Sequence, residues 1–241
     1  KIGKNKINKI IYTSSSSVYG SINNNIKNAE YINVDCTIKR IHEVINSGAV
    51  PVFFSSESVF SGKRGNYGEL DNPNPIFEYG LHKFAVENFI KNNTDQYYIL
   101  RLSKVFASEK EPKSLVTSWL SQLENNEDIT IAIDNIFCPI HILDVKNILE
   151  SIIGIGEFGI YHLCSSKAQT RSEMLDIVMN EYSKYRPHKG SIIRKKLHEI
   201  KGAEMLPINT SMLSEKVEDL TGYRPSAFSY WSRKIVQQYF Q

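Results

Sequence analysis

Two neighbouring stretches carry most of the information about the fold, Val52-Phe53-Phe54-Ser55-Ser56-Glu57-Ser58-Val59-Phe60-Ser61-Gly62 and Glu78-Tyr79-Gly80-Leu81-His82-Lys83. The first is an apolar run that ends in hydroxyl side chains, which is typical of a strand buried on both faces of a sheet. The second predicts a helix. We expect Asn74 to cap this helix and Pro75 to lie in its first turn, where a missing N–H has no cost.

Tyr79 and Lys83 are four residues apart, so the predicted helix places them on one face. A phenol beside an ammonium group is a proton donor whose pKa falls below its usual value of about 10. A serine at the end of the neighbouring strand is able to hydrogen-bond the same substrate oxygen. This set of groups suits the reduction of a carbonyl or the oxidation of an alcohol.

These residues resemble the extended short-chain dehydrogenase/reductase family, which is the NAD-dependent epimerase/dehydratase superfamily. The likeness is strongest to the branch that contains dTDP-4-dehydrorhamnose reductase. Tyr-x-x-x-Lys alone is a weak signal, but the serine upstream and the arginine strand downstream make the combination specific. The matching pieces are Ser55–Gly62, the Glu69…Asp71…Pro73…Pro75 run, Tyr79–Lys83 and Leu100-Arg101-Leu102-Ser103-Lys104-Val105-Phe106.

The resemblance implies a role for each member of the site. Tyr79 is expected to protonate the carbonyl oxygen, and Lys83 to bind the nicotinamide ribose and keep the pKa of Tyr79 within working range. Ser56 occupies the position that orients the carbonyl, whereas Ser55 is interpreted as structural. The expected cofactor is NADP or NAD, and the serines Ser14, Ser15 and Ser16 are expected to pass close to it.

The resemblance also suggests where the sugar binds. Glu57 matches a position that is acidic in both reductases and sugar-nucleotide dehydratases, and Lys104 stands where it is able to approach the sugar. The dehydratases carry a second carboxylate directly after the first, and here that position is Ser58, which argues against elimination. Lys113, Arg171 and Arg194 are candidates for contact with a diphosphate, and none of the three is preferred.

Three functions are compatible with this pattern. The favoured one is NAD(P)H-dependent reduction of a 4-keto group on a nucleotide-activated deoxysugar, with Tyr79 as proton donor. A nucleotide-sugar epimerase uses the same serine, tyrosine and lysine. A non-catalytic protein that keeps the fold and binds a cofactor or regulates another protein is the third. The expected partner is a nucleotide-sugar substrate, and a homodimer is possible.

Strands and helices alternate along the first half of the chain, which predicts a Rossmann-type, doubly wound parallel sheet. The helix before the core strand carries Val34, Ile38 and Ile41 on one stripe and ends at Gly48. In the family, the strand at Ile10–Ser17 would be the fourth, so two βαβ turns of roughly 30 residues each should precede it. We therefore expect residues 1–103 to form a partial dinucleotide-binding domain. Residues 104–241 are expected to form a smaller, mainly substrate-binding α/β part, with a strand and helix returning to the sheet.

Two motifs are misleading. Thr13-Ser14-Ser15-Ser16-Ser17-Val18-Tyr19-Gly20 looks like a second catalytic strand end, but no Tyr-x-x-x-Lys follows it at a workable distance. Gly154-Ile155-Gly156-Glu157-Phe158-Gly159 has the dinucleotide-binding spacing, but a helix precedes it and a strand follows, which is the reverse of the required order. We interpret it as a connection with glycine helix caps.

Composition excludes several classes of function. The net charge of +3, with scattered lysines, argues against nucleic-acid binding. No apolar run approaches the roughly 18 residues that a membrane span needs. The three cysteines have no metal-ligand spacing and favour a reducing compartment, so we expect a cytoplasmic protein. The histidines form no ligand set, and His82 is expected to be solvated.

Overall fold

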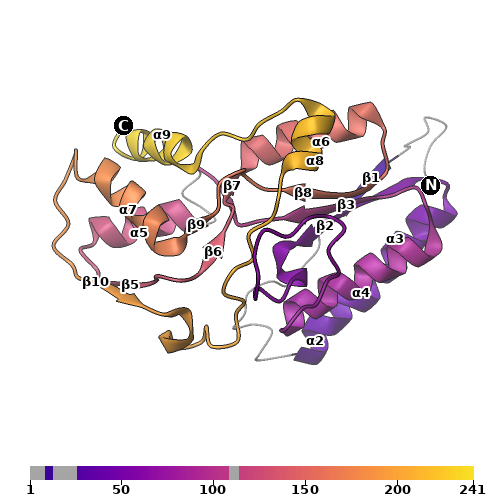
Figure 1. The fold of residues 1–241 in the computed structure, drawn as a ribbon, viewed down its shortest axis with the longest axis horizontal. Helices are drawn as coiled ribbons and strands as arrows, with labels where there is room; N and C mark the ends of the chain where they lie inside the picture. Colours follow the sequence, from indigo (N-terminus) through magenta and orange to yellow (C-terminus); the bar gives the residue numbers. More distant parts are fainter. Residues whose placement is uncertain (1–8, 13–25, 109–113) are drawn as a thin grey trace.

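The structure is a computed structural model that describes residues 9–12, 26–108 and 114–241. It has two parts, which lie side by side in Figure 1. One is built on a parallel sheet with helices on both faces. The other gathers the later helices around a short two-stranded ladder.

The main sheet contains four strands in the order β1-β2-β3-β8. These strands are β1 Lys9–Tyr12, β2 Val50–Ser56, β3 Tyr98–Leu102 and β8 Gly159–Leu163. Every neighbouring pair is parallel. Strands that are far apart in sequence and parallel in space require crossover connections, which here are helices. The predicted doubly wound α/β fold is therefore confirmed.

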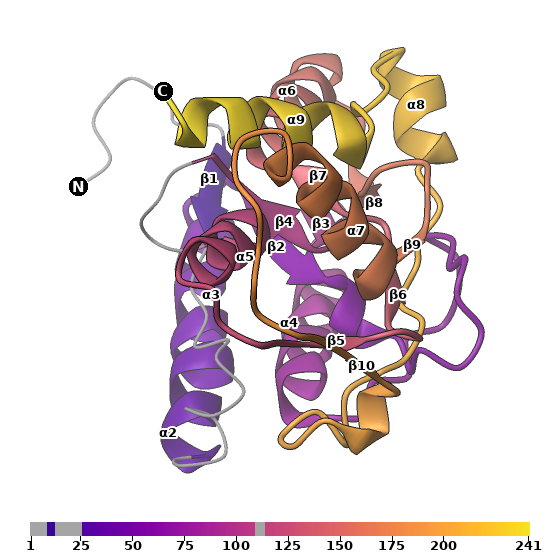
Figure 2. The same ribbon diagram turned by 90° about the vertical axis from the view of Figure 1, so that its left-hand side faces the viewer.

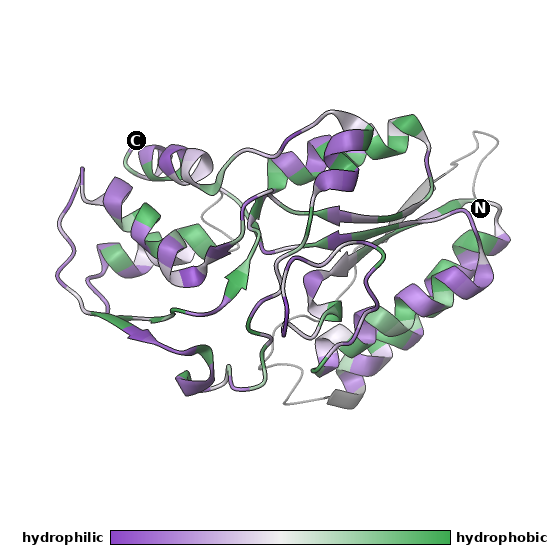
Figure 3. Ribbon diagram, in the orientation of Figure 1, coloured by the Kyte–Doolittle hydropathy of each residue, from purple (hydrophilic) through white to green (hydrophobic). Residues whose placement is uncertain are grey.

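Helices cover both faces of the sheet (Figures 1 and 3). On one face, α3 (Thr37–Asn46) and α4 (Glu78–Asn93) enclose an apolar cluster that includes Phe53, Val86 and Ile99. On the other face, α6 (Ile142–Ile155) and α8 (Glu215–Thr221) pack on a second apolar cluster. The central strands β2 and β3 are thus buried on both sides, which explains their mainly apolar sequences.

The second part holds the largest apolar cluster, which extends from Phe106 to Val236. Figure 2 shows its helices gathered at one end of the sheet. Its helices are α5 Leu115–Glu124, α7 Arg171–Tyr182 and α9 Phe228–Tyr239, and its parallel ladder pairs β5 Ile129–Ala132 with β10 Ile192–Lys195. Between the two parts lie the short pairs β4 Val105–Phe106 with β7 Ile140–His141, and β6 Ile136–Phe137 with β9 Gln169–Thr170.

Short elements complete the described chain. Helix α2 (Ile26–Glu30) continues into a π-helix at Tyr31–Cys36 that leads into α3. Single 3₁₀ turns lie at Glu57–Val59 and Leu197–Glu199. The turn at Glu57–Val59 follows β2 directly, so the residues after this strand fold back toward the start of α4.

The start of one helix differs from the sequence prediction. Helix α4 begins at Glu78, with Phe77 as N-cap, and not at Pro75. The backbone N–H of Asn74 donates to the carbonyl of Val59, which holds this segment against the turn after β2 and delays the helix. Helix α7 is capped by Thr170, whose side chain exchanges hydrogen bonds with Glu173. A complete capping box satisfies two otherwise unpaired donors.

The glycine-rich motif after α6 has the expected structural role. Gly156 ends the helix in the left-handed conformation, with φ of 85°, and β8 begins at Gly159. The prediction of a helix-to-strand connection is confirmed. Among the described residues, no helix combines the length and apolar character that crossing a bilayer requires.

Candidate functional site

A close approach of α4 to the turn after β2 positions Tyr79. A Cβ atom added to Gly80 would lie 2.1 Å from the carbonyl oxygen of Ser58 and 2.9 Å from the Cβ of Pro75. Only a residue without a side chain allows the helix to pack this tightly against the turn. The preceding residue, Tyr79, therefore stands beside the residues that follow Ser56.

Lys83 lies beneath Tyr79, almost fully buried, with 6% of its surface exposed. Its Nζ donates to the carbonyl oxygen of Phe54 at 2.8 Å. It also lies 4.8 Å from the centre of the Phe53 ring and 5.7 Å from that of Tyr79. Burial lowers the pKa of Lys83 to about 8, and the carboxylate of Glu87 opposes this shift.

Ser56 and Tyr79 line one cavity of about 510 Å³. We call it the tyrosine cavity; its wall also contains Leu102, Ser103 and Lys104. The Oγ of Ser56 accepts the backbone N–H of Ser58 at 3.2 Å, which fixes the hydroxyl at the end of β2. The volume falls in the range of small-molecule sites, about 300–1,000 Å³.

A smaller cavity of about 130 Å³ adjoins the first and shares Glu57 and Lys104 with it. We call it the arginine cavity, because Arg171 lines it together with Asn135. The Nε of Arg171 donates to Oδ1 of Asn135 at 3.2 Å, and its guanidinium lies 5.5 Å from the centre of the Phe137 ring. The arginine cavity therefore holds two cations and one carboxylate.

The electrostatics of these three groups are coupled. Burial raises the pKa of Glu57 to about 7, although the charges of Lys104 and Arg171 act to lower it. Burial lowers the pKa of Lys104, and the charge of Arg171 lowers it further. Within the described parts of the chain, Oε2 of Glu57 and Oγ of Ser103 are buried without a hydrogen-bond partner. A buried polar atom without a hydrogen-bond partner costs free energy. A ligand that hydrogen-bonds these two atoms would therefore bind more tightly.

A third cavity, of about 690 Å³, continues from the arginine cavity and shares Leu206 and Pro207 with it. Leu206 lines all three cavities. Ile76 and Met205, both exposed, contribute to its mainly apolar wall. The three cavities are therefore neighbours with shared walls, and together we call them the cleft.

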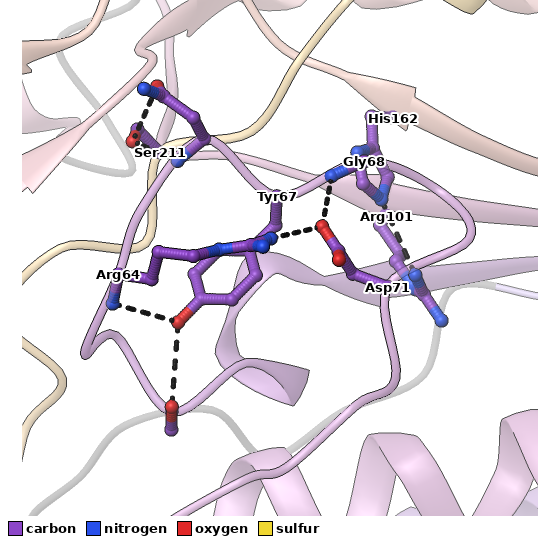
Figure 4. A network of polar contacts seen from close by, with 9 residues as sticks. Arg64, Tyr67, Gly68, Asp71, Arg101, His162 and Ser211 are labelled. Atoms are coloured by element: carbon purple, nitrogen blue, oxygen red, sulfur yellow. Dashed lines mark hydrogen bonds and ion pairs between the residues drawn. The ribbon is translucent and has the colours of Figure 1, made fainter.

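The loop after β2 is fastened to the segment that provides Leu206 (Figure 4). The backbone of Tyr67 donates to the carbonyl of Ser211 and accepts from the N–H of Leu213, both at 2.9 Å. The ring of Tyr67 stacks on Phe60 at 4.2 Å, and Arg64 forms an ion pair with Asp71 across the loop. These contacts hold the wall of the cleft in place.

The structure brings Ser56, Glu57, Tyr79 and Lys104 together around the tyrosine cavity, with Lys83 behind Tyr79. Ser14, Ser15 and Ser16 lie outside the described residues, as does Lys113. The roles assigned to all of these residues stay predictions.

Other residues singled out in the sequence have different surroundings from those expected. The expectation that His82 is solvated is wrong, because it is 5% exposed and lies 3.3 Å from Nδ2 of Asn33. Of the candidate diphosphate ligands, Arg171 lines the cleft, whereas Arg194 pairs with Asp176. No cluster of three histidine, cysteine or acidic side chains suits a metal ion in the described chain.

Sequence reasoning missed several residues of the site. Asn135, Ser103 and Leu206 line the cleft, and the sequence alone assigned a role to none of them. A signal for Ser103 was its position directly after the arginine strand and beside Lys104. Asn135 and Leu206 come from loops whose location depends on the packing of the second part.

Comparisons with known proteins identify relatives of this chain. Over 126 residues, the chain is 29% identical to the "Probable low-salt glycan biosynthesis reductase Agl14" of Haloferax volcanii, a match that covers 51% of this chain and 42% of that relative. Over 162 residues, it is 24% identical to methionine adenosyltransferase 2 subunit beta of Bos taurus, a match that covers 64% of this chain and 48% of that relative. The chain thus spans less than half the length of either.

Solved structures share the fold. The structure of dTDP-4-dehydrorhamnose reductase from Bacillus anthracis str. Ames in complex with NADP matches 96% of this chain and 80% of its own, with a TM-score of 0.81 and 21% identity. A family model described as the RmlD substrate binding domain matches residues 7–240. This match covers almost the whole sequence, and the chain therefore belongs to the RmlD substrate binding domain family.

Proposed function

We propose that this protein reduces the 4-keto group of a nucleotide-activated deoxysugar with NADPH or NADH. The observation that supports this most directly is the tyrosine cavity, where Ser56 and Tyr79 line one wall and Lys83 lies against the Tyr79 ring. The names of two similar proteins, a reductase of glycan biosynthesis and a dTDP-4-dehydrorhamnose reductase, agree with it.

The residues fit a nicotinamide dinucleotide. Nζ of Lys83 carries three N–H donors, and within the described chain it makes one hydrogen bond, to the carbonyl of Phe54. Its remaining donors suit the ribose hydroxyls of the cofactor, which would also satisfy a buried cation. When bound, the nicotinamide supplies the hydride for the reduction.

Side chains of the protein bind the carbonyl oxygen of the substrate and donate the proton to it. The hydroxyls of Ser56 and Tyr79 hold the carbonyl oxygen of the sugar in the tyrosine cavity. Tyr79 gives its phenolic proton to this oxygen as negative charge develops on it, and the ammonium of Lys83 stabilises the phenolate that remains. The buried environment of Lys83 strengthens this interaction, because charges attract more strongly where water is excluded.

The arginine cavity suits the rest of the substrate. Lys104 and Arg171 place two cations beside the tyrosine cavity, which matches the charge of a nucleotide diphosphate. The unpartnered Oε2 of Glu57 suits a sugar hydroxyl. In this proposal, residues 1–103 bind the cofactor, and residues 104–241 provide most of the contacts with the substrate.

Two alternatives rest on specific observations. A nucleotide-sugar epimerase would use Ser56, Tyr79 and Lys83 in the same way. A non-catalytic role is favoured by the similarity to methionine adenosyltransferase 2 subunit beta, which is named as a subunit. The intact set of serine, tyrosine and lysine favours an enzyme over the non-catalytic role.

The decisive experiment uses the full-length protein and the Tyr79→Phe variant, with NADPH and NADH and a panel of nucleotide-linked 4-keto-6-deoxy sugars. General acid catalysis contributes about 10²–10⁴-fold, so kcat should fall by that factor while cofactor affinity stays nearly unchanged. Oxidation of the reduced cofactor gives the rate, and calorimetry gives the affinity.

A Tyr79→Phe variant as active as the parent would overturn the assignment of Tyr79. A parent that binds cofactor but reduces none of these sugars would favour the non-catalytic alternative. Isomerisation of a sugar nucleotide without net oxidation of the cofactor would favour the epimerase.

A further inference from the structure

A row of buried polar side chains crosses the main sheet at the level of Ser55, the residue before Ser56 in β2. Ser55 of β2, Arg101 of β3 and His162 of β8 are direct neighbours in the parallel register. Nη1 of Arg101 lies 3.4 Å from Nε2 of His162, and all three residues are buried. The next residue of β2 is Ser56, so this row lies immediately under the end of the strand.

Glu87 reaches this row from α4. It is completely buried, and its carboxylate accepts hydrogen bonds from Oγ of Ser55 at 2.5 Å and from Nε and Nη2 of Arg101 at 3.0 and 2.8 Å. Replacement of such a buried ion pair by apolar groups of similar size is often neutral or stabilising, whereas removing one partner leaves an uncompensated buried charge and is strongly destabilising. Stability alone therefore gives little reason for a charged pair at this place.

Helix α4 thus holds the end of β2 at two successive residues. Lys83 bonds the carbonyl of Phe54, and Glu87, one helical turn later, bonds the side chain of Ser55. Residues four apart share one face of a helix, so both contacts come from the same side of α4. Any shift of α4 along β2 would break both of these hydrogen bonds.

We propose that Glu87 is a positioning residue that fixes Lys83 and the Ser56 end of β2 relative to each other. The proposal rests on the proposed reduction, because the residues it aligns are the ones assigned there to the chemistry. Small displacements of reacting groups, about 1 Å, are able to cost 10²-fold in rate.

The carboxylate of Glu87 also acts on the charge of Lys83. Around Lys83, Tyr79 and Glu87 come from its own helix and Phe54 from β2, while Arg101 and His162 lie across Glu87 on β3 and β8. Burial, followed by the charge of Arg101, lowers the pKa of His162 to about 3, so this ring is neutral. Glu87 raises the pKa of Lys83 against the effect of burial.

The test is the double variant Glu87→Gln/Arg101→Met in the full-length protein. It removes both buried charges together, which avoids the unpaired arginine that Glu87→Gln alone would leave. The matched control is Asp144→Asn. Asp144 is equally buried and bonds Tyr223 and Trp231, away from the cleft.

Two readouts decide the proposal. We expect the double variant to fold and to lose about 10- to 100-fold in kcat, with less change in KM. We also expect Lys83 to titrate at a lower pH, as seen in the ¹³Cε resonance assigned with Lys83→Arg. Asp144→Asn should lose stability but keep both kcat and the Lys83 titration.

A folded double variant with the kcat and the Lys83 titration of the parent would overturn the proposal. Equal loss of kcat in Asp144→Asn would also overturn it, since destabilisation would then explain the effect. If the parent reduces no substrate, the proposed function fails, and the Lys83 titration still decides whether Glu87 acts on Lys83.

Discussion

Glu57 illustrates how surroundings give one carboxylate an unusual property. It follows Ser56 directly and faces Lys104 and Arg171 in the arginine cavity. Two nearby cations favour its ionised form, yet burial outweighs them and raises its pKa to about 7. Glu57 is therefore able to change charge near neutral pH, next to the place where the sugar is proposed to bind.

This raised pKa predicts a pH-dependent stability. Between about pH 4.5 and 7 the folded protein binds more protons at Glu57 than the unfolded chain, so stability falls as pH rises through this window. Glu57→Gln removes this loss. The variant should be more stable than the parent at pH 8, by on the order of 2 kcal/mol, and should show no such gain at pH 4.

Urea unfolding at a series of pH values, without substrate, measures this difference. The measurement at pH 4 is the internal control, because Glu57 is then protonated in both the folded and the unfolded state. A gain in stability that is the same at pH 4 and pH 8 would contradict the prediction.

At the level of secondary structure, the site depends on where α4 begins and how closely it packs. An extended segment holds the chain away from helical geometry until Phe77, and Gly80 then allows the first turn to touch the carbonyl of Ser58. Tyr79 is fixed by both features. If the helix began at Pro75, Tyr79 would no longer lie in its first turn.

Gly80→Ala tests this packing. The added methyl group meets the backbone of Ser58 at 2.1 Å, so either the helix or the turn must move. We expect a loss of about 1–3 kcal/mol in the free energy of unfolding, which is typical of overpacking, together with a lower kcat. Thermal unfolding and the reductase assay measure the two effects.

Gly154→Ala is the matched control. Gly154 lies in α6, and an added Cβ would meet no atom within 4 Å. Alanine in an exposed helix position is more stable than glycine by about 0.5–1 kcal/mol. If Gly80→Ala were as harmless as Gly154→Ala, close packing would not explain the position of Tyr79.

Across the molecule as a whole, the C-terminal helix fastens the second part to the first. Trp231 of α9 stacks on His141 at 3.8 Å and donates its indole N–H to Asp144 of α6 at 2.7 Å. Tyr223 donates its hydroxyl to the same carboxylate at 2.6 Å. A buried carboxylate thus joins a helix of the main sheet to the last helix of the chain.

Trp231→Ala should loosen this junction. It removes the ring stack and leaves Asp144 with one donor fewer, so we expect a loss of about 3 kcal/mol in the free energy of unfolding. Trp231→Phe keeps a ring against His141 and removes only the N–H, so its loss should be smaller, about 1 kcal/mol. Chemical denaturation of both variants measures the difference, and equal losses would show that the hydrogen bond, not the ring, holds α9.

Features that depend on neighbouring residues were predictable from the amino-acid sequence. Apolar runs of strand length and a helical stripe predicted β2, β3 and α3, and the spacing of Tyr79 and Lys83 placed them on one face of α4. Residues a few positions apart have nearly fixed relative geometry within a helix or strand. The order of these elements was then enough to predict a parallel, doubly wound sheet.

Which distant residues share the cleft depended on the packing of the folded chain. Lys113, Arg171 and Arg194 were equivalent in sequence. The pairing of β9 with β6, directly before α7, brings Arg171 into the cleft, whereas Arg194 pairs with Asp176. His82 was expected in water, but α4 turns it toward Asn33. These outcomes could not be predicted, because the burial, partner and pKa of a side chain depend on contacts between segments far apart in sequence, which periodicity and spacing do not specify.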